Sequence, residues 1–144
     1  MSKYVKDVIK GKSKMVWTIS PDAKVFDAVT EMAARQVGAL VVSEGGKVVG
    51  IITERDYARK IILEGKSSKN TPVGEIMTRR VIYVVPEQKV EECMALMSEK
   101  NIRHLPVLNG DILVGMISIR DVVKEMISEK DFIIDQLTRY VSGA

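Results

Sequence analysis

The sequence contains very little cysteine and histidine, two residue types that often carry metal, redox or nucleophilic chemistry. Its 144 residues include one cysteine, Cys93, and one histidine, His104. A single cysteine cannot form an intrachain disulfide, which suits a reducing compartment. A lone histidine with no second histidine or cysteine at ligand spacing does not predict a zinc site. A P-loop, a Gly-x-Gly-x-x-Gly motif and a Ser-His-Asp order are also absent. The sequence therefore predicts no catalytic residue, no metal and no required cofactor, and thus a protein that is not an enzyme.

Long apolar runs and strong net charge are absent too. The sequence has no apolar run long enough to span a bilayer, and its charged first residues, 1–7, do not resemble a secretory signal. The net charge of +3 comes from 22 basic and 19 acidic residues that are dispersed along the chain. The densest basic patch, Lys10, Lys12 and Lys14, is predicted to be a solvated linker rather than a nucleic-acid site. We therefore expect a soluble cytoplasmic protein that binds neither nucleic acid nor membrane.

The sequence repeats itself at a distance of 65 residues. Val16–Glu64 aligns with Val81–Glu129 without a gap, and 15 of the 49 aligned positions are identical. Unrelated sequences of average composition would share about three. The period is longer than that of solenoid repeats, so the chain is predicted to be a duplicated unit of domain size.

Each copy has the pattern of a β-α-β-β-α unit. In the first copy the predictions are a strand at Val16–Ile19, a helix capped by Ser20 with Pro21 as its first residue, strands at Ala39–Val42 and Val48–Ile52 around a glycine turn, and a helix from Glu54. In the second copy they are a strand at Val81–Val85, a helix from Pro86, strands at Leu105–Leu108 and Ile112–Ile117, and a helix from Ile119. Cys93 lies on the apolar stripe of a helix and is predicted to be a buried small side chain.

The whole chain is predicted to have an α/β (α+β) fold. A unit of about 60 residues is marginally stable alone, so the two copies are expected to bury their apolar sheet faces against each other with approximate two-fold symmetry. The predicted domains are residues 3–66 and 72–128, followed by a helical tail at 129–144. In this tail, Ile133, Ile134, Leu137 and Val141 share one helical face, which packs either on its own chain or on a second chain.

The most informative positions are the two junctions between a strand and a helix. They read Thr53-Glu54-Arg55-Asp56 and Ser118-Ile119-Arg120-Asp121, with a hydroxyl residue three positions before an aspartate. Such a pair can cap a helix. It can also bind a ligand, because the N–H groups of a helix start attract anions, a carboxylate can accept from two ribose hydroxyls, and arginine suits phosphate oxygens. The sequence leaves both interpretations open.

These two motifs, the β-α-β-β-α order and the run Arg103–Val107 resemble a tandem pair of cystathionine-beta-synthase (CBS) domains. The resemblance extends from about Lys3 to Ser128 and is greatest to stand-alone CBS-pair proteins of bacteria and plant organelles, through Val37–Val42 and Gly50–Lys60. It implies ligand clefts between the two sheets that hold AMP, ATP, NAD-type or S-adenosyl compounds. It also implies association of CBS pairs into a homodimer.

The candidate site comprises fourteen residues, and the resemblance assigns a role by position to twelve of them. Asp56 and Asp121 would hold ribose hydroxyls, and Thr53 and Ser118 would meet ribose or phosphate. Adenine would be enclosed by groups near Thr18, Ile19, Ala39, Tyr83, Val84 and Ile102, and phosphate would be faced by Arg103 and His104. The other two candidates, Arg55 and Arg120, have forked donors that suit phosphate oxygens. Trp17 could belong to the core or to a cleft wall.

The two copies are not equivalent. Arg103 and His104 stand at the start of a strand where such basic residues face phosphate in the family, whereas the first copy has Gly38 and Ala39 there. We therefore expect the second site to bind more tightly, although His104 is equally compatible with a structural role. The predicted function is a non-catalytic regulatory module that binds an adenine nucleotide, AMP above all, and signals energy state to a partner. The alternative is a pure interaction module whose target is a metabolic enzyme or a thioredoxin-like protein.

Overall fold

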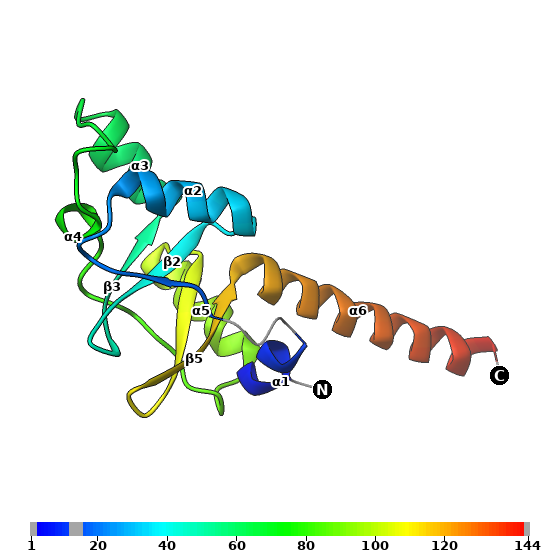
Figure 1. Cartoon of the computed structure of the whole chain (residues 1–144). Helices are drawn as coiled ribbons and strands as arrows, with labels where there is room; N and C mark the ends of the chain where they lie inside the picture. Colours follow the sequence, from blue (N-terminus) through cyan, green and yellow to red (C-terminus); the bar gives the residue numbers. More distant parts are fainter. Residues whose placement is uncertain (1–2, 12–15, 143–144) are drawn as a thin grey trace. The chain divides into compact units, whose positions relative to one another are not determined.

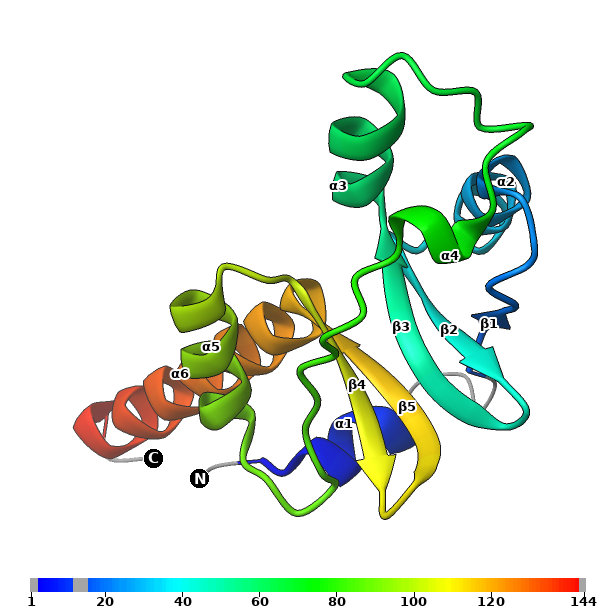
Figure 2. The ribbon, with the colours of Figure 1, turned by 90° about the vertical axis from the view of Figure 1, so that its left-hand side faces the viewer.

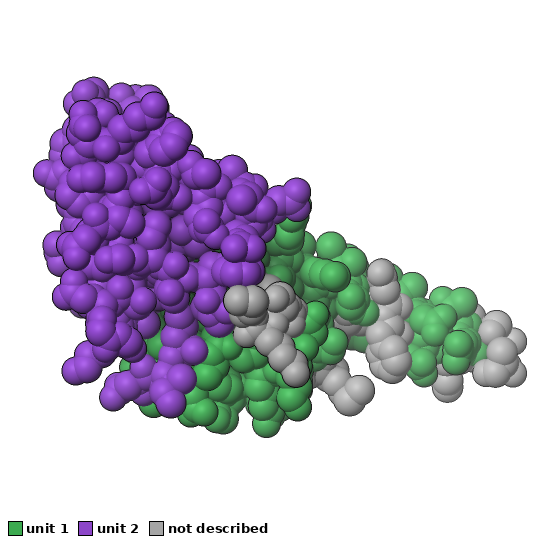
Figure 3. Space-filling view, in the orientation of Figure 1, with its two compact units in different colours: residues 1–14, 83–110, 114–144 green, residues 15–82, 111–113 purple. Residues whose placement is uncertain are grey.

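The computed structural model describes residues 3–11 and 16–142, and it divides into two compact units (Figure 3). The first-repeat unit comprises residues 15–82 and 111–113. The second-repeat unit comprises residues 1–14, 83–110 and 114–144. The predicted basic patch lies partly outside the described residues, because Lys12 and Lys14 fall in the gap. No helix in the described ranges is long and apolar enough to cross a bilayer.

The first-repeat unit is built on a three-stranded sheet in the order β1-β2-β3 (Figure 2). Strand β1 (Thr18–Ile19) is parallel to β2 (Ala39–Glu44), which forms an antiparallel hairpin with β3 (Lys47–Thr53). The helical segments are α2 (Val25–Arg35), α3 (Glu54–Tyr57), the π-helical turn η1 (Ala58–Ile62) and α4 (Val73–Ile76). Their apolar faces and the sheet enclose a core that includes Val25, Ala28, Met32, Leu40, Val42, Ile52, Ile61, Val73 and Ile76.

The second-repeat unit has the same plan with one strand reduced to a bridge. It contains α1 (Val5–Lys10), α5 (Val90–Lys100), β4 (His104–Asn109) and α6 (Ile119–Ser142), together with residues 114–118 of β5 (Ile112–Ser118). A parallel bridge joins Val84 to Val107, and these residues stand 65 positions after Ile19 and Val42, which pair in the first-repeat unit. Cys93 is fully buried, and burial raises the pKa of its thiol to about 11. The thiol is therefore protonated at neutral pH, consistent with a packing role.

The segment before each repeat packs on the other repeat. In the first-repeat unit, Val73 N donates to Ala23 O at 2.7 Å and Gly74 N donates to Pro21 O at 2.8 Å. In the second-repeat unit, the N–H groups of residues 5 and 6 donate to Gln88 O and Pro86 O at 2.8 and 3.0 Å. The amino-terminal segment thus completes the unit of the second repeat, and the linker segment completes that of the first. The predicted boundaries 3–66 and 72–128 follow the sequence repeat, whereas the compact units follow this packing.

The predicted start of the first helix is wrong by four residues. Helix α2 begins at Val25 with Lys24 as its N-cap residue, and Ser20 Oγ accepts from Asp22 N at 3.1 Å in a turn before it. The carbonyl of Pro21 accepts from the linker segment, and Val25 N donates to Thr71 O at 2.9 Å. Because these groups bond to a distant segment, residues 21–24 do not form the first helical turn.

The outer strands are shorter than predicted, and the last helix is longer. The first strand covers only Thr18–Ile19, and the predicted strand Val81–Val85 is reduced to the bridge at Val84. The tail predicted from residue 129 onwards is helical as far as Ser142, but it is not a separate element, because α6 runs unbroken from Ile119 to Ser142 and is the longest helix in Figure 1. Val122 in its first turn is buried, whereas the apolar side chains of Val123, Met126 and Ile127 are exposed.

Candidate functional site

The junction between β3 and α3 is closed by a reciprocal cap. Asp56 Oδ2 accepts from Thr53 N at 3.0 Å and from Thr53 Oγ1 at 3.1 Å, while Thr53 Oγ1 accepts from Asp56 N at 3.1 Å. The predicted capping interpretation is therefore correct for this pair. The Asp56 residue is only 7% exposed, so its carboxylate depends on protein groups for hydrogen bonds.

Two further residues contact the same carboxylate, and neither is among the site residues predicted from the sequence. Thr78 Oγ1 donates to Asp56 Oδ1 at 3.2 Å, and Lys60 Nζ lies 3.0 Å from Asp56 Oδ1. Lys60 Nζ also donates to Ile76 O at 2.9 Å. The i,i+4 spacing of Asp56 and Lys60 on one helical segment is a signal that could have identified the ion pair. The contact with Thr78, 22 residues away, has no local signal.

The junction between β5 and α6 has the same cap. Asp121 Oδ2 accepts from Ser118 N at 2.8 Å and from Ser118 Oγ at 3.0 Å, and Ser118 Oγ accepts from Asp121 N at 3.2 Å. Glu125 stands 65 residues after Lys60 and forms an ion pair with Lys3 at 2.9 Å. The hydrogen bond from Lys3 and the charge of Glu125 raise the pKa of Lys3 above its ordinary value. The cap is thus common to both repeats, whereas the residue one helical turn after the aspartate is positively charged in the first repeat (Lys60) and negatively charged in the second (Glu125).

The first backbone N–H group of α3 and that of α6 each donate a hydrogen bond to the residue that precedes β2 or β4. Glu54 N donates to Gly38 O at 3.0 Å, and Ile119 N donates to Arg103 O at 2.8 Å. These bonds place the unequal residues, Gly38 with Ala39 and Arg103 with His104, directly beside the caps. Arg103 is exposed and His104 is half-buried at the start of β4, whereas Ala39 is buried and pairs with Thr53.

The other predicted site residues divide between exposed and enclosed positions. Thr18, Tyr83 and Arg120 are exposed, Ile19, Arg55 and Ile102 are half-buried, and Val84 is fully buried. The backbone of Val84 is bonded to its own unit on both sides, with its N–H on Pro106 O and its C=O accepting from Leu108 N. The structure therefore brings Thr53 together with Asp56 and Ser118 together with Asp121 at hydrogen-bond distance.

Trp17 has a structural role in the first-repeat unit. It packs against the apolar core, and the guanidinium of Arg35 lies 3.6 Å from the centre of its ring. Arg35 Nε in turn donates to Glu31 Oε1 at 2.8 Å. Of the two open interpretations, these contacts favour the core.

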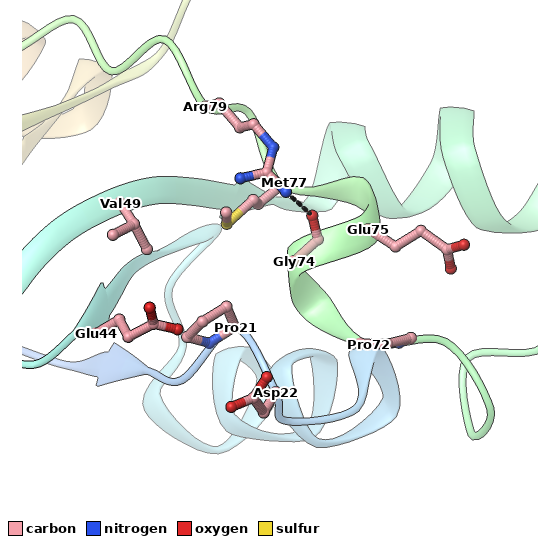
Figure 4. A pocket seen from close by; sticks show the side chains of 9 residues that line it. All are labelled: Pro21, Asp22, Glu44, Val49, Pro72, Gly74, Glu75, Met77 and Arg79. Carbon is pink, nitrogen blue, oxygen red and sulfur yellow. Dashed lines mark hydrogen bonds between the residues drawn. The ribbon is translucent and has the colours of Figure 1, made fainter.

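A surface pocket of about 390 Å³ lies elsewhere in the first-repeat unit (Figure 4). Its lining residues are Pro21, Asp22, Glu44, Val49, Pro72, Gly74, Glu75, Met77 and Arg79. Arg79 donates to Gly74 O at 3.0 Å, and the Glu75 carboxylate points away from the pocket (Figure 4). None of the predicted site residues lines it. Within the described ranges, no three His, Cys, Asp or Glu side chains are grouped as a metal site.

Comparison with known proteins identifies the family. The CBS domain family matches residues 5–63 and 73–128. The chain belongs to the CBS domain family. This confirms the predicted resemblance and the α/β fold with two CBS repeats.

Similar proteins are CBS proteins over nearly the whole chain. The mitochondrial CBS domain-containing protein CBSX3 of Arabidopsis thaliana is 44% identical over 99% of this chain and 73% of its own length. A solved structure from Burkholderia ambifaria, described as a putative signal-transduction protein with CBS domains, is 48% identical with a TM-score of 0.85 and covers 88% of this chain and 95% of that one. The CBS domain pair of protein MJ0100, solved in complex with 5′-methylthioadenosine and S-adenosyl-L-methionine, is 27% identical with a TM-score of 0.80 and covers 90% of this chain and 99% of that one.

Proposed function

We propose that this CBS pair is a non-catalytic regulatory module that binds an adenine nucleotide. The observation that carries the proposal is the matched geometry of Thr53 with Asp56 and of Ser118 with Asp121, at the start of a helix in each repeat. A carboxylate held in this way can accept from the hydroxyls of a ribose, and a serine or threonine hydroxyl can turn towards a ligand. AMP is the first candidate, and ATP, NAD and S-adenosyl compounds share the same adenosine part.

The adenosine part is also what the ligands of a related protein have in common. The MJ0100 pair, whose chain is covered almost completely, carries two compounds that both contain adenosine. In our chain, Arg103 and His104 lie beside the second cap, where basic side chains favour a phosphate. We therefore propose that the second-repeat site binds AMP more tightly than the first.

Thermal stabilisation by AMP tests this proposal. We expect the wild-type protein to melt at a higher temperature in the presence of AMP, because a ligand that binds only the folded state stabilises it. Asp121→Ala should weaken AMP binding at least tenfold, which is the value of one hydrogen bond to a charged group, and should remove most of the stabilisation. Calorimetric titration of both proteins measures the affinities.

The same experiment separates nucleotide sensing from its alternative. If no adenylate stabilises or binds the wild-type protein, the chain is better explained as an interaction module for a metabolic enzyme or a thioredoxin-like protein. Two sites of equal affinity would contradict the proposed inequality. Asp22→Ala is a suitable control, because this exposed aspartate lies outside both caps.

We further propose that the chain signals as a homodimer through α6. Among the side chains of this helix whose burial the structure describes, six exposed apolar ones lie within one stripe: Val123, Met126, Ile127, Ile133, Ile134 and Leu137. Their spacing is the same in both directions from Lys130, since 123 and 137, 126 and 134, and 127 and 133 are equally distant from it. A two-fold interface requires such self-complementarity, so an antiparallel pair of α6 helices would match apolar residue to apolar residue.

The exposed apolar area of the stripe is large enough to form most of such an interface. It amounts to on the order of 500 Å² per copy, as large as a typical monomer's largest apolar patch. A stable interface needs about 800 Å² per partner. Lys130 at the centre has a long side chain that can reach water beside the axis. The stripe therefore provides most of the contact, and flanking residues would provide the remainder.

Leu137→Glu should weaken the dimer. The substitution places a charge opposite the apolar position 123 of the second copy, at both ends of the paired stripes, and we expect the dissociation constant to rise at least tenfold. Sedimentation equilibrium of the wild type and the variant measures this constant, and Thr138→Glu, at an exposed neighbouring position outside the stripe, controls for one added negative charge. A monomeric wild-type protein at micromolar concentration would contradict the proposal.

Localisation and partner identity are part of the same proposal. We propose that the protein is cytoplasmic, as its composition predicts, and that nucleotide binding favours one arrangement that a target protein recognises. Fractionation of cells that produce the tagged protein tests the location.

A further inference from the structure

The Asp56 carboxylate already receives four hydrogen-bond donors from its own unit. Oδ2 accepts from the backbone and hydroxyl of Thr53, and Oδ1 accepts from Thr78 Oγ1 at 3.2 Å and from Lys60 Nζ at 3.0 Å. An ionised carboxylate has about four acceptor positions. The acceptor capacity that a ribose would use is therefore filled.

Lys60 is the donor most able to leave. Thr53 is bonded through the backbone, and Thr78 belongs to a segment whose N–H donates to Ile51 O at 2.8 Å. Lys60 instead reaches Asp56 through a flexible side chain that is 39% exposed. Lys60 Nζ makes a second contact, with Ile76 O, which holds the ammonium beside the carboxylate. If the side chain left Asp56, its ammonium group would be hydrated by water.

The position of Lys60 is specific to the first repeat. The equivalent residue 65 positions later is Glu125, whose carboxylate has no N–H to donate to Asp121 and is paired with Lys3. The two repeats therefore share the cap and differ in whether the residue four positions after the aspartate can donate a hydrogen bond to it.

We propose that Lys60 is an intramolecular competitor of the ribose for Asp56 and lowers the nucleotide affinity of the first-repeat site. The ammonium occupies the acceptor that a ribose hydroxyl needs, so binding at this site requires Lys60 to leave both Asp56 and Ile76 O. This inference rests on the proposed function, because it names a residue that lowers the affinity of one of the two proposed nucleotide sites.

The test compares AMP binding in the Asp121→Ala background, where the first-repeat site remains. Lys60→Met keeps the length of the side chain and removes its donors. We expect Asp121→Ala with Lys60→Met to bind AMP about tenfold more tightly than Asp121→Ala alone, the value of one hydrogen bond to a charged group. Arg59→Met in the same background is the matched control, because it removes one positive charge from an exposed neighbour on η1 and should not raise the affinity.

The melting temperature provides a second measurement on the same proteins. Lys60→Met should lower the melting temperature of the free protein, because Asp56 loses its counter-charge, and AMP should raise it by more than in Asp121→Ala alone. If Lys60→Met leaves the AMP affinity of Asp121→Ala unchanged, the inference is overturned. It is also overturned if Lys60→Met weakens AMP binding by more than Arg59→Met does, since Lys60 would then assist the ligand. If the wild-type protein binds no AMP at all, the proposed function fails together with the inference, an outcome distinguishable from failure of the inference alone.

Discussion

Asp56→Ala is expected to lower the free energy of unfolding by about 3 kcal/mol, through loss of a helix cap and of further hydrogen bonds to a charged group. The substitution removes the acceptor of Thr53 N and leaves Thr78 and Lys60 without their common partner. The carboxylate is almost completely enclosed, so water replaces these bonds poorly. Urea denaturation should show a midpoint lower by about 1 M or more.

Two other variants separate the causes of this loss. Glu54→Ala removes an exposed carboxylate from the first turn of the same helix, and we expect a change of less than about 0.5 kcal/mol, as at ordinary surface positions. Asp56→Asn keeps one oxygen acceptor and removes the charge, so its loss should be intermediate. Equal losses in Asp56→Ala and Glu54→Ala would show that the cap and its two additional donors contribute no more than a surface charge.

The parts of this site that are local in sequence could be predicted, and the parts that join distant segments could not. A hydroxyl residue followed three positions later by Asp56 is a pattern within one helical turn, and it gave the correct cap in both repeats. Lys60 lies one helical turn after Asp56, so its ion pair with that carboxylate could also have been predicted from the local spacing. Thr78 reaches Asp56 only because the linker segment packs beside β3, with Thr78 and Ile51 exchanging backbone hydrogen bonds at 2.8 and 3.0 Å.

The same distinction explains the errors in the fold. Alternating and helical apolar patterns located the central strands and helices, because these patterns report which face of an element is buried. The start of α2 depended on Val25 N donating to Thr71 O, a bond between residues that no periodic pattern connects. The sequence also did not predict that residues 3–10 pack in the unit of the second repeat. The segment that makes the equivalent contacts in the other unit is 71–78, which lies 68 positions later and is therefore out of register with the 65-residue repeat.

A second large loss of stability is expected from Gly50→Ala, which tests how closely this linker segment packs. A Cβ atom at position 50 would lie 2.7 Å from Met77 Sδ and 3.0 Å from the backbone oxygen of Thr78. Alanine in a strand restricts the unfolded chain and so stabilises by less than about 1 kcal/mol. Overpacking of a filled contact costs about 1–3 kcal/mol, and here the obstructing oxygen accepts from Ile51 N, so the clash should dominate with a net loss of about 2 kcal/mol.

Urea denaturation of Gly50→Ala and of Gly11→Ala measures this steric effect. Gly11 has a negative φ, and a Cβ there would have its nearest neighbour at 3.7 Å, so Gly11→Ala should not be destabilised. Because Thr78 donates to Asp56 as well, a shift of the linker in Gly50→Ala should also weaken the contacts of that carboxylate. The losses in Gly50→Ala and Asp56→Ala should then be less than additive when the two are combined. Strict additivity would mean that the linker can move away from β3 while Asp56 keeps its donors.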